Sequence, residues 1–167
     1  NDIAPNPDFE LLSRQAKLYS QVKDKPEVIV ALGGGSVIDS AKVFAAAGNG
    51  FEKIKKFLET KNGGQGLSPT PIIAVPSTSG TGSEVTCWAT VWDKKNNHKY
   101  SLAHKKLFPE IAIIDPKLMI EKPYELTLVT ALDALSHALE SIWNINANII
   151  SLNHATYSAK SLSLIHI

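Results

Sequence analysis

Three stretches of the sequence carry side chains that could do chemistry. Residues 33–36 read Gly-Gly-Gly-Ser and follow a short apolar run. Residues 76–86 read Pro-Ser-Thr-Ser-Gly-Thr-Gly-Ser-Glu-Val-Thr and are rich in hydroxyls and glycines. Asp133 and His137 stand four residues apart. A glycine turn, a polar loop and a carboxylate–imidazole pair, in this order, are the parts of an enzyme that uses a nucleotide and a metal ion.

The glycine turn suits a phosphate. Consecutive glycines after a strand permit positive φ and a close approach of the backbone to a ligand, and the first amides of the following helix attract an anion. Ser36 stands where a helix cap is expected, with Asp39 three residues on, close to a capping box. The pattern is not a G-x-G-x-x-G fingerprint, because Ile38 occupies the third glycine position, and it is not a P-loop. A simple turn with a capped helix remains an alternative.

The hydroxyl-rich stretch also follows an apolar run. It offers five hydroxyls that could line a polar ligand without adding charge, from Ser77, Thr78, Ser79, Thr81 and Ser83. Ligands of open α/β sheets collect at the carboxyl ends of the strands. This position favours ligand binding over the alternative, which is a serine-rich surface loop.

Asp133 and His137 are spaced i, i+4, so on a helix both side chains project from one face. A carboxylate oxygen and an imidazole nitrogen at that spacing can share one divalent ion. On spacing alone, a surface Asp–His pair explains the two residues better than a metal site does. The flanking residues of 131–139 are mostly small and apolar, which predicts a largely buried helix and weakens the interpretation as a surface pair.

The elements that must position these residues alternate between helix and strand up to about residue 123. Apolar periodicity predicts helices over 9–22, 37–47 and 51–60. A continuous apolar run predicts a parallel strand, covered on both faces, at 28–32, and similar runs predict a second buried strand at 71–76 and a third strand at 111–114. Weaker strands are predicted at 85–91 and 100–103 around a turn at 93–97. Beyond Pro123 only helices are predicted, over 125–142 and 150–164. The sequence therefore predicts an α/β domain over 1–124 and a helical domain beginning at 125–167.

Composition excludes several classes of protein. The 17 basic and 16 acidic residues of this 167-residue chain leave a formal charge of +1, which argues against a nucleic-acid partner. The single cysteine, Cys87, excludes an intrachain disulfide framework and fits a reducing compartment, with the cytoplasm as the expected location. No apolar run approaches the roughly 20 residues of a membrane span, so no membrane partner is expected.

Together these motifs resemble those of the iron-containing (group III) alcohol dehydrogenases. The matching stretches are Gly-Gly-Gly-Ser-x-x-Asp-x-Ala-Lys at 33–42, the hydroxyl-rich stretch at 76–86, Ile-Asp-Pro at 114–116 and Asp-Ala-Leu-Ser-His-Ala-Leu-Glu at 133–140. The resemblance covers essentially the whole chain. It implies a partial Rossmann-like dinucleotide-binding domain followed by the beginning of an all-helical metal-binding domain, as in dehydroquinate synthase. It also implies NAD or NADP, and a divalent metal that is iron or, in some members, zinc.

The resemblance implies roles for single residues and identifies no catalytic residue with certainty. The pyrophosphate would be held by Gly34, Gly35 and Ser36, and Asp39 is the acidic residue of the glycine motif. The ribose and nicotinamide side would be held by Thr78, Thr81 and Ser83, and Lys99 falls where the family keeps a lysine near the cofactor. The first two metal ligands would be Asp133 and His137.

The implied activity is a metal-dependent, NAD(P)-linked alcohol dehydrogenase or aldehyde reductase. Its partner would be a small-molecule alcohol or aldehyde, and a homo-oligomer is compatible with it. Residues 136–148 resemble the branch that reduces phosphonoacetaldehyde. The family's third and fourth metal ligands are histidines that would fall beyond Ile167, and His154 and His166 lie too close to His137 to match them. We therefore expect this chain alone to be inactive, with exposed apolar faces over 125–167.

Three other functions stay open. Glycerol dehydrogenase and dehydroquinate synthase share the fold, the glycine motif and the Asp–His helix, although the stretch at 77–86 favours the alcohol dehydrogenases. A non-catalytic nucleotide-binding remnant would follow from the missing ligands. A structural or interaction domain with an incidental glycine turn would have no affinity for NAD(H).

Overall fold

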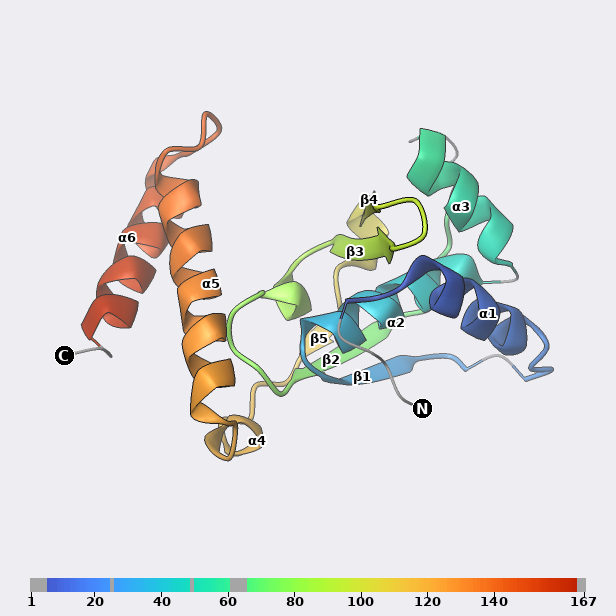
Figure 1. Ribbon diagram of the computed structural model, residues 1–167, viewed down its shortest axis with the longest axis horizontal. Helices are drawn as coiled ribbons and strands as arrows, with labels where there is room; N and C mark the ends of the chain where they lie inside the picture. Colours follow the sequence, from blue (N-terminus) through green and yellow to red (C-terminus); the bar gives the residue numbers. More distant parts are fainter. Residues whose placement is uncertain (1–5, 25, 49, 61–65, 165–167) are drawn as a thin grey trace. The chain divides into compact units, whose positions relative to one another are not determined.

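The computed structural model describes residues 6–24, 26–48, 50–60 and 66–164 (Figure 1). The chain forms two compact units. The first contains the residues up to Ser77 together with Ser83–Leu118, and the second contains Thr78–Gly82 and the residues from Met119 onward. The functional division between residues 124 and 125 stays a prediction.

A three-stranded parallel sheet lies at the centre of the first unit. β1 (Ile29–Gly33) pairs with β2 (Ile72–Pro76), and β2 pairs with the short β5 (Ile111–Ala112). Parallel pairing requires a crossover, which runs through α2 (Gly35–Ala47) and α3 (Phe51–Thr60). The predicted α/β class is confirmed, and the helix predicted over 51–60 has the predicted bounds.

One face of this sheet is covered by α2. The buried strand residues Ala31, Ile72 and Ala74 form a cluster with small and branched residues of the helix. On the other face Val30 is 62% exposed and Leu32 is 60% exposed. The expectation that β1 is covered on both faces is therefore wrong. Its apolar run suits two covering layers, but the described residues supply a helix on only one side.

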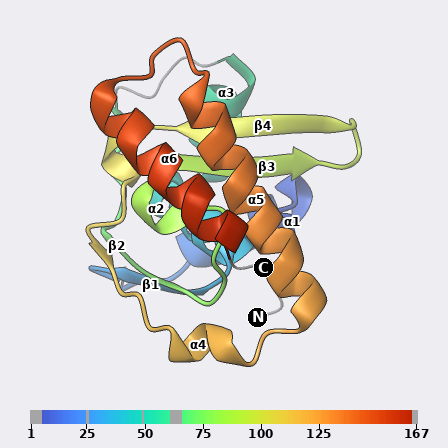
Figure 2. The ribbon, with the colours of Figure 1, turned by 90° about the vertical axis from the view of Figure 1, so that its left-hand side faces the viewer.

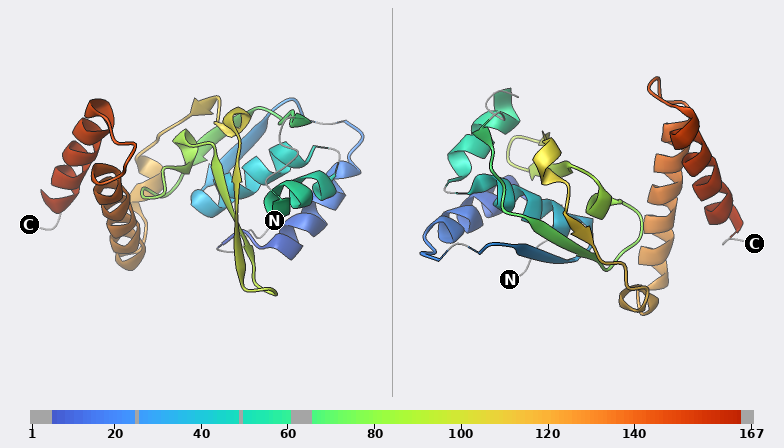
Figure 3. Two further views of the ribbon diagram at one scale, coloured as in Figure 1. Left: turned by 90° about the horizontal axis from the view of Figure 1, so that it is seen from above. Right: turned by 180° about the vertical axis from the view of Figure 1, so that it is seen from behind.

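A second, larger core lies between α2, α3, α1 (Phe9–Ser20) and a β-hairpin. The hairpin consists of β3 (Trp88–Asp93) and β4 (His98–Ala103), which are antiparallel (Figure 3). Large apolar side chains fill this core, each at most 2% exposed: Leu12, Val43, Ile54, Leu58, Val91 and Leu102. The predicted turn at 93–97 is confirmed, since Asp93 Oδ1 accepts a hydrogen bond from Asn96 N–H at 3.0 Å.

Several boundaries differ from the sequence pattern. The strand predicted over 85–91 begins only at Trp88, because Ser83–Val85 form a short 3₁₀ helix, η2. The strand predicted over 111–114 is reduced to Ile111–Ala112, although Ile113 N–H still donates to the Ala74 oxygen at 2.8 Å. Two short helices have no counterpart in the pattern, η3 (Lys105–Leu107) and α4 (Lys117–Ile120).

The second unit is built on a helical hairpin. α5 (Tyr124–Ile142) and α6 (Ile149–Leu164) lie side by side (Figure 2). Large apolar side chains of both helices are exposed, for example Val129 at 63% and Ile150 at 66%, as expected. The 78–82 loop approaches α5 closely: a Cβ on Gly80, which has φ +150°, would lie 2.7 Å from the carbonyl oxygen of Thr130. Among the described residues, no helix has the length and apolar character needed to cross a membrane.

Gly33→Ala is expected to destabilise the first unit. Gly33 has φ +154°, and a Cβ there would lie 2.6 Å from Cγ2 of Val37. Backbone strain of this kind costs about 1–3 kcal/mol, so urea unfolding followed by circular dichroism should show a free energy of unfolding lower by that amount. Gly50→Ala is the matched control, since nothing lies within 4 Å of a Cβ there. Equal stability of the two variants would show that the turn does not require glycine.

Candidate functional site

The glycine turn joins the end of β1 to the start of α2. Gly33 closes the strand, Gly34 is the N-cap, and the helix begins at Gly35. The first N–H groups of an α-helix have no partner within the helix. The turn therefore presents helix N–H groups at the carboxyl end of a strand, which is an arrangement that binds anions.

The expected capping box is absent. The N-cap is Gly34 and Ser36 lies inside the first turn of α2, because the glycines allow the helix to start earlier than a serine cap would. The Ser36 hydroxyl accepts a hydrogen bond from Asn6 N–H at 3.2 Å. The Asp39 carboxylate bonds to later parts of the chain rather than back to the cap.

The hydroxyl-rich stretch leaves the neighbouring strand at the same edge of the sheet. β2 ends at Pro76, which is opposite Gly33 in the register. Ser77 N–H then donates to the carbonyl oxygen of Gly33 at 3.0 Å. The structure thus brings the start of this stretch together with the glycine turn, as the sequence predicts.

Lys42 of α2 holds the far end of the same stretch. Its side chain is fully buried. Nζ donates to the carbonyl oxygens of Ser83 and Trp88, each at 2.7 Å, and to the hydroxyls of Ser83 at 3.0 Å and Thr86 at 3.2 Å. A buried ammonium is tolerated only when hydrogen bonds replace its water shell. The four acceptors explain how this charge is retained inside the unit.

Asp39 extends the network on the same helix. Its Oδ1 accepts the Ser83 hydroxyl at 2.6 Å, and its Oδ2 accepts Thr90 N–H at 2.8 Å. The Ser83 hydroxyl therefore donates to Asp39 and accepts from Lys42. Asp39 and Ser83 are both predicted cofactor residues. In the structure they bond to each other, and their contact with a cofactor stays a prediction.

Burial shifts the pKa of each charged group in the direction that favours its neutral form. Burial raises the pKa of Asp39, against the hydrogen bonds from Ser83 and Thr90 and the charge of Lys42. Burial lowers the pKa of Lys42 from 10.5 to about 8, against the opposing electrostatic effect of the Asp39 carboxylate. Lys42 can therefore lose its proton in mildly alkaline solution.

Sequence reasoning assigned no role to Lys42 or Thr86. The sequence does carry a signal for Lys42, since it is the only charged residue besides Asp39 in the mostly apolar stretch 37–47. A lysine is almost never fully buried without partners. A lone cation in an apolar helix therefore indicates that acceptors are buried beside it, although the pattern does not say which ones.

Lys99 and the two threonines lie on other parts of the chain. Lys99 is exposed on β4, and its Nζ lies 5.2 Å from the centre of the Trp92 ring, within range of a cation–π interaction. Thr78 and Thr81 belong to the 78–82 loop of the second unit. The cofactor contacts of all three stay predictions.

Asp133 and His137 project from one face of α5. Oδ1 of the aspartate lies 3.6 Å from Nε2 of the histidine. Two ligands of a tetrahedral zinc ion lie roughly 3.4 Å apart, so this donor pair fits a shared divalent ion. The predicted burial is wrong, since the side chain of Asp133 is 41% exposed and that of His137 is 57% exposed. Within the described ranges, no third His, Cys, Asp or Glu joins the pair to form a metal-binding group.

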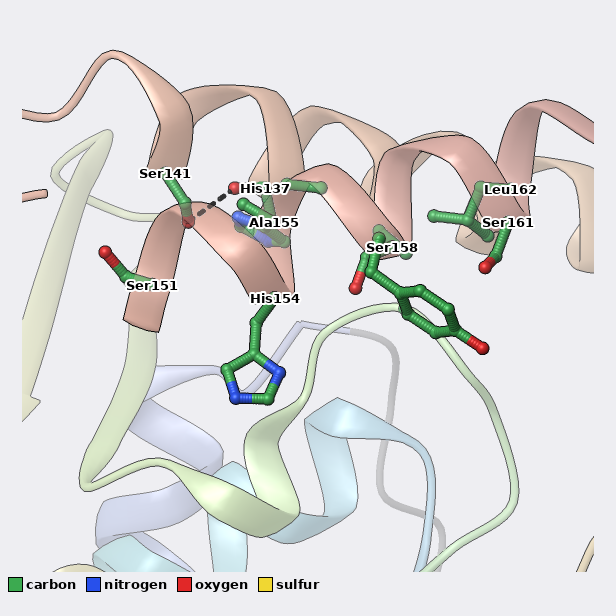
Figure 4. Close-up of a pocket in the computed structure, with 12 residues that line it drawn as sticks. His137, Ser141, Ser151, His154, Ala155, Ser158, Ser161 and Leu162 are labelled. Carbon is green, nitrogen blue, oxygen red and sulfur yellow. Dashed lines mark hydrogen bonds between the residues drawn. The ribbon is translucent and has the colours of Figure 1, made fainter. Parts of the chain in front are cut away.

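A groove of about 570 Å³ lies beside this pair in the second unit (Figure 4). His137 and Ser141 of α5 line it together with His154 and Ser158 of α6, and Gly80 borders it. Sequence reasoning treats His154 as an ordinary helix residue. In the structure, His154 lines the same groove as His137, which is a predicted metal ligand. The spacing of the two histidines in the sequence does not indicate this. His166 lies outside the described residues.

Comparison with known proteins finds close relatives. The family model for iron-containing alcohol dehydrogenase matches residues 1–116. An aldehyde-alcohol dehydrogenase of Streptococcus pneumoniae is 38% identical over 149 residues, which cover 84% of this chain and 17% of that protein. An NADPH-dependent butanol dehydrogenase of Clostridium saccharobutylicum is 36% identical over 146 residues, which cover 83% of this chain and 36% of that protein.

The fold also matches solved structures. Sulfoacetaldehyde reductase from Bifidobacterium kashiwanohense, solved in complex with NAD+, matches with a TM-score of 0.85 at 34% sequence identity. The match covers 97% of this chain, and therefore α5, but only 42% of that protein. The chain thus spans less than half the length of each of these relatives. Asp133 and His137 lie outside the family-model match.

Lys42→Met is expected to remove an alkaline pH dependence of stability. The folded chain releases the Lys42 proton near pH 8, whereas the ordinary lysine value is 10.5. Between these values the unfolded chain binds more protons, so the contribution of Lys42 to the free energy of unfolding rises with pH. Urea unfolding of parent and variant from about pH 7 to about pH 10 should show a difference that grows in favour of the parent. A difference independent of pH would contradict the lowered pKa, and Lys53→Met, on an exposed lysine of α3, is the control.

Proposed function

Since the chain belongs to the iron-containing alcohol dehydrogenase family, we propose that it supplies the dinucleotide site and two metal ligands of an NAD(P)-linked alcohol dehydrogenase or aldehyde reductase. The reaction is hydride transfer between a nicotinamide and a small alcohol or aldehyde. A cytoplasmic setting is proposed from the single cysteine of the chain.

One observation carries the proposal. The glycine turn and the hydroxyl-rich stretch follow two adjacent parallel strands, and the bond from Ser77 N–H to the Gly33 oxygen joins them. Ligands of open α/β sheets bind outside the carboxyl ends of the strands. Two polar, glycine-containing segments meeting at that edge, next to a helix N-terminus, favour a ligand that carries phosphates.

The residues would divide the dinucleotide between them. The N–H groups of Gly34, Gly35 and Ser36 would hold the pyrophosphate, as the helix start favours. The hydroxyls of Thr78, Thr81 and Ser83, with Lys99, would lie on the ribose and nicotinamide side. The relatives include an NADPH-dependent enzyme and one solved with NAD+, so NAD and NADP both stay candidates.

Asp133 and His137 would be the metal ligands of this chain. Their 3.6 Å separation and their donor types support a divalent ion, iron in the first place and zinc as the alternative. A bound ion would supply Lewis-acid polarisation of the substrate oxygen. His137 lines a groove that also carries hydroxyl groups, which suits a small polar substrate.

The substrate class we propose is a small aldehyde and its alcohol, and more narrowly one with an anionic headgroup. The stretch 136–148 resembles the branch that acts on phosphonoacetaldehyde. The relative from Bifidobacterium kashiwanohense is a sulfoacetaldehyde reductase. Phosphonate and sulfonate groups share size, shape and negative charge, so the two resemblances agree on the kind of substrate.

A second candidate is a nucleotide-binding chain without catalysis. It is favoured by the metal pair, which has no third ligand among the described residues. Bound metal together with turnover would distinguish the enzyme from this remnant.

Gly35→Val is expected to weaken NADH binding at least tenfold. The branched side chain at the first residue of α2 would stand between a phosphate and the helix N–H groups, and a tenfold loss corresponds to about 1.4 kcal/mol. Fluorescence titration with NADH measures the effect. Gly50→Val is the matched control, because Gly50 lies next to the start of a helix, α3, and a Cβ there would stand in open space. Unchanged affinity of Gly35→Val would contradict the phosphate assignment.

The chain by itself is expected to hold no stoichiometric iron or zinc after dialysis and to show no alcohol-dependent formation of NAD(P)H. A catalytic divalent site usually has at least three protein ligands and one open position, and Asp133 and His137 supply only two. Metal analysis and assays with ethanol, 1,2-propanediol, 2-hydroxyethylphosphonate and 2-hydroxyethanesulfonate test this. Metal-dependent turnover would show that the pair is completed within this chain.

A further inference from the structure

We propose that Lys42 is a positioning residue, which fixes the hydroxyl-rich loop 77–86 so that its threonines can meet the nicotinamide side of the dinucleotide. This inference rests on the proposed function. Lys42 itself would not touch the cofactor, because its Nζ is buried and directed at the chain's own oxygens.

The loop is held at both ends by the first unit. At its start, Ser77 N–H bonds to the Gly33 oxygen at 3.0 Å. At its end, the Lys42 ammonium binds Ser83 through both its carbonyl and its hydroxyl, and binds Thr86 through its hydroxyl. The same helix that begins at the glycine turn therefore also holds the far end of the loop. Residues 78–82 are the span between the two anchors.

A charged side chain is required here because of the backbone. The carbonyl oxygens of Ser83 and Trp88 point to Nζ at 2.7 Å. Buried carbonyls need a donor, and an apolar residue in place of Lys42 would leave them without this one. Asp39 completes the anchor, since it accepts the Ser83 hydroxyl at 2.6 Å and balances the positive charge. The network thus defines where the loop ends and β3 begins.

Loss of the anchor should affect the two halves of the dinucleotide differently. The pyrophosphate is assigned to the glycine turn, which precedes Lys42 on the same helix and keeps its own hydrogen bonds. The nicotinamide side is assigned to Thr78 and Thr81, which lie between the anchors. Without the Lys42 anchor the loop would adopt several conformations, so the hydroxyls of Thr78 and Thr81 would no longer be held in one position. The glycine turn would keep its conformation.

The test compares NADH with ADP, which lacks the nicotinamide half. Lys42→Met should weaken NADH binding at least tenfold and ADP binding less than twofold, by isothermal titration at a temperature where the variant is folded. Hydrogen exchange read by mass spectrometry should show faster exchange in residues 77–90 of Lys42→Met, with the exchange of α1 and α3 unchanged. Lys53→Met, an exposed lysine on α3, should match the parent in each measurement.

Thr86→Val is the milder variant, for use if Lys42→Met does not fold. It removes the Thr86 hydroxyl, which is one acceptor of the Lys42 ammonium, and it keeps the charge of Lys42. It should weaken NADH binding about threefold, with ADP binding unchanged. Equal losses of NADH and ADP affinity, or exchange in 77–90 as slow as in the parent, would overturn the positioning role.

Failure of the proposed function and failure of the positioning role give different results in this test. If the parent chain binds neither NADH nor ADP, the dinucleotide assignment is wrong and the role of Lys42 toward a cofactor is wrong with it. If the parent binds both nucleotides and Lys42→Met binds them equally well, the proposed function stands and only the positioning role is overturned.

Discussion

The buried ammonium of Lys42 is the interaction on which the arrangement of the candidate cofactor site depends. It is one charge inside an apolar helix, and its hydrogen bonds reach the 3₁₀ helix η2, the residue after it and the first residue of β3. Burying a charged group costs free energy, and leaving it buried without hydrogen-bond partners costs more. The carbonyl oxygens of Ser83 and Trp88 must therefore stay directed at Lys42 of α2, and this fixes the path of the chain between these two residues. The 78–82 loop must end where this path begins, at Ser83.

The same interaction explains where the sequence pattern was misleading. The run around Val85 looks like a strand because it is apolar and β-branched, yet Val85 lies in η2 and is 63% exposed. The Ser83 oxygen accepts the Thr86 N–H at 3.3 Å within this turn and also accepts from Lys42 Nζ at 2.7 Å. By contrast, β1, β2 and α3 follow from local patterns, because a continuous apolar run or a helical stripe determines each of them without a distant partner. Local patterns predict elements well and predict long-range side-chain bonds poorly.

The apolar surfaces of the chain make a related point. Val30 and Leu32 on the sheet, and Val129 and Leu132 on α5, have the composition of residues covered from a second side, and all four are exposed. A pattern of side chains reports the surroundings for which a segment is suited. It does not report whether those surroundings are made by the described residues. The wrong expectations for β1 and for the Asp133–His137 helix have this single cause.

The nucleotide half and the metal half of the proposed function rest on different kinds of support. The nucleotide half rests on tertiary structure, since the glycine turn and the hydroxyl-rich loop are far apart in sequence and are joined by the bond between Ser77 and Gly33 and by the Lys42 network. The metal half rests on one helix, because the i, i+4 spacing of Asp133 and His137 brings the two groups together whatever surrounds them. A pair made by helix geometry alone is also found on ordinary helix surfaces, whereas a fully buried lysine with four acceptors is rarely incidental. The physical argument is therefore stronger for the nucleotide than for the metal, and the binding of a dinucleotide is the property of this chain from which its function is best approached.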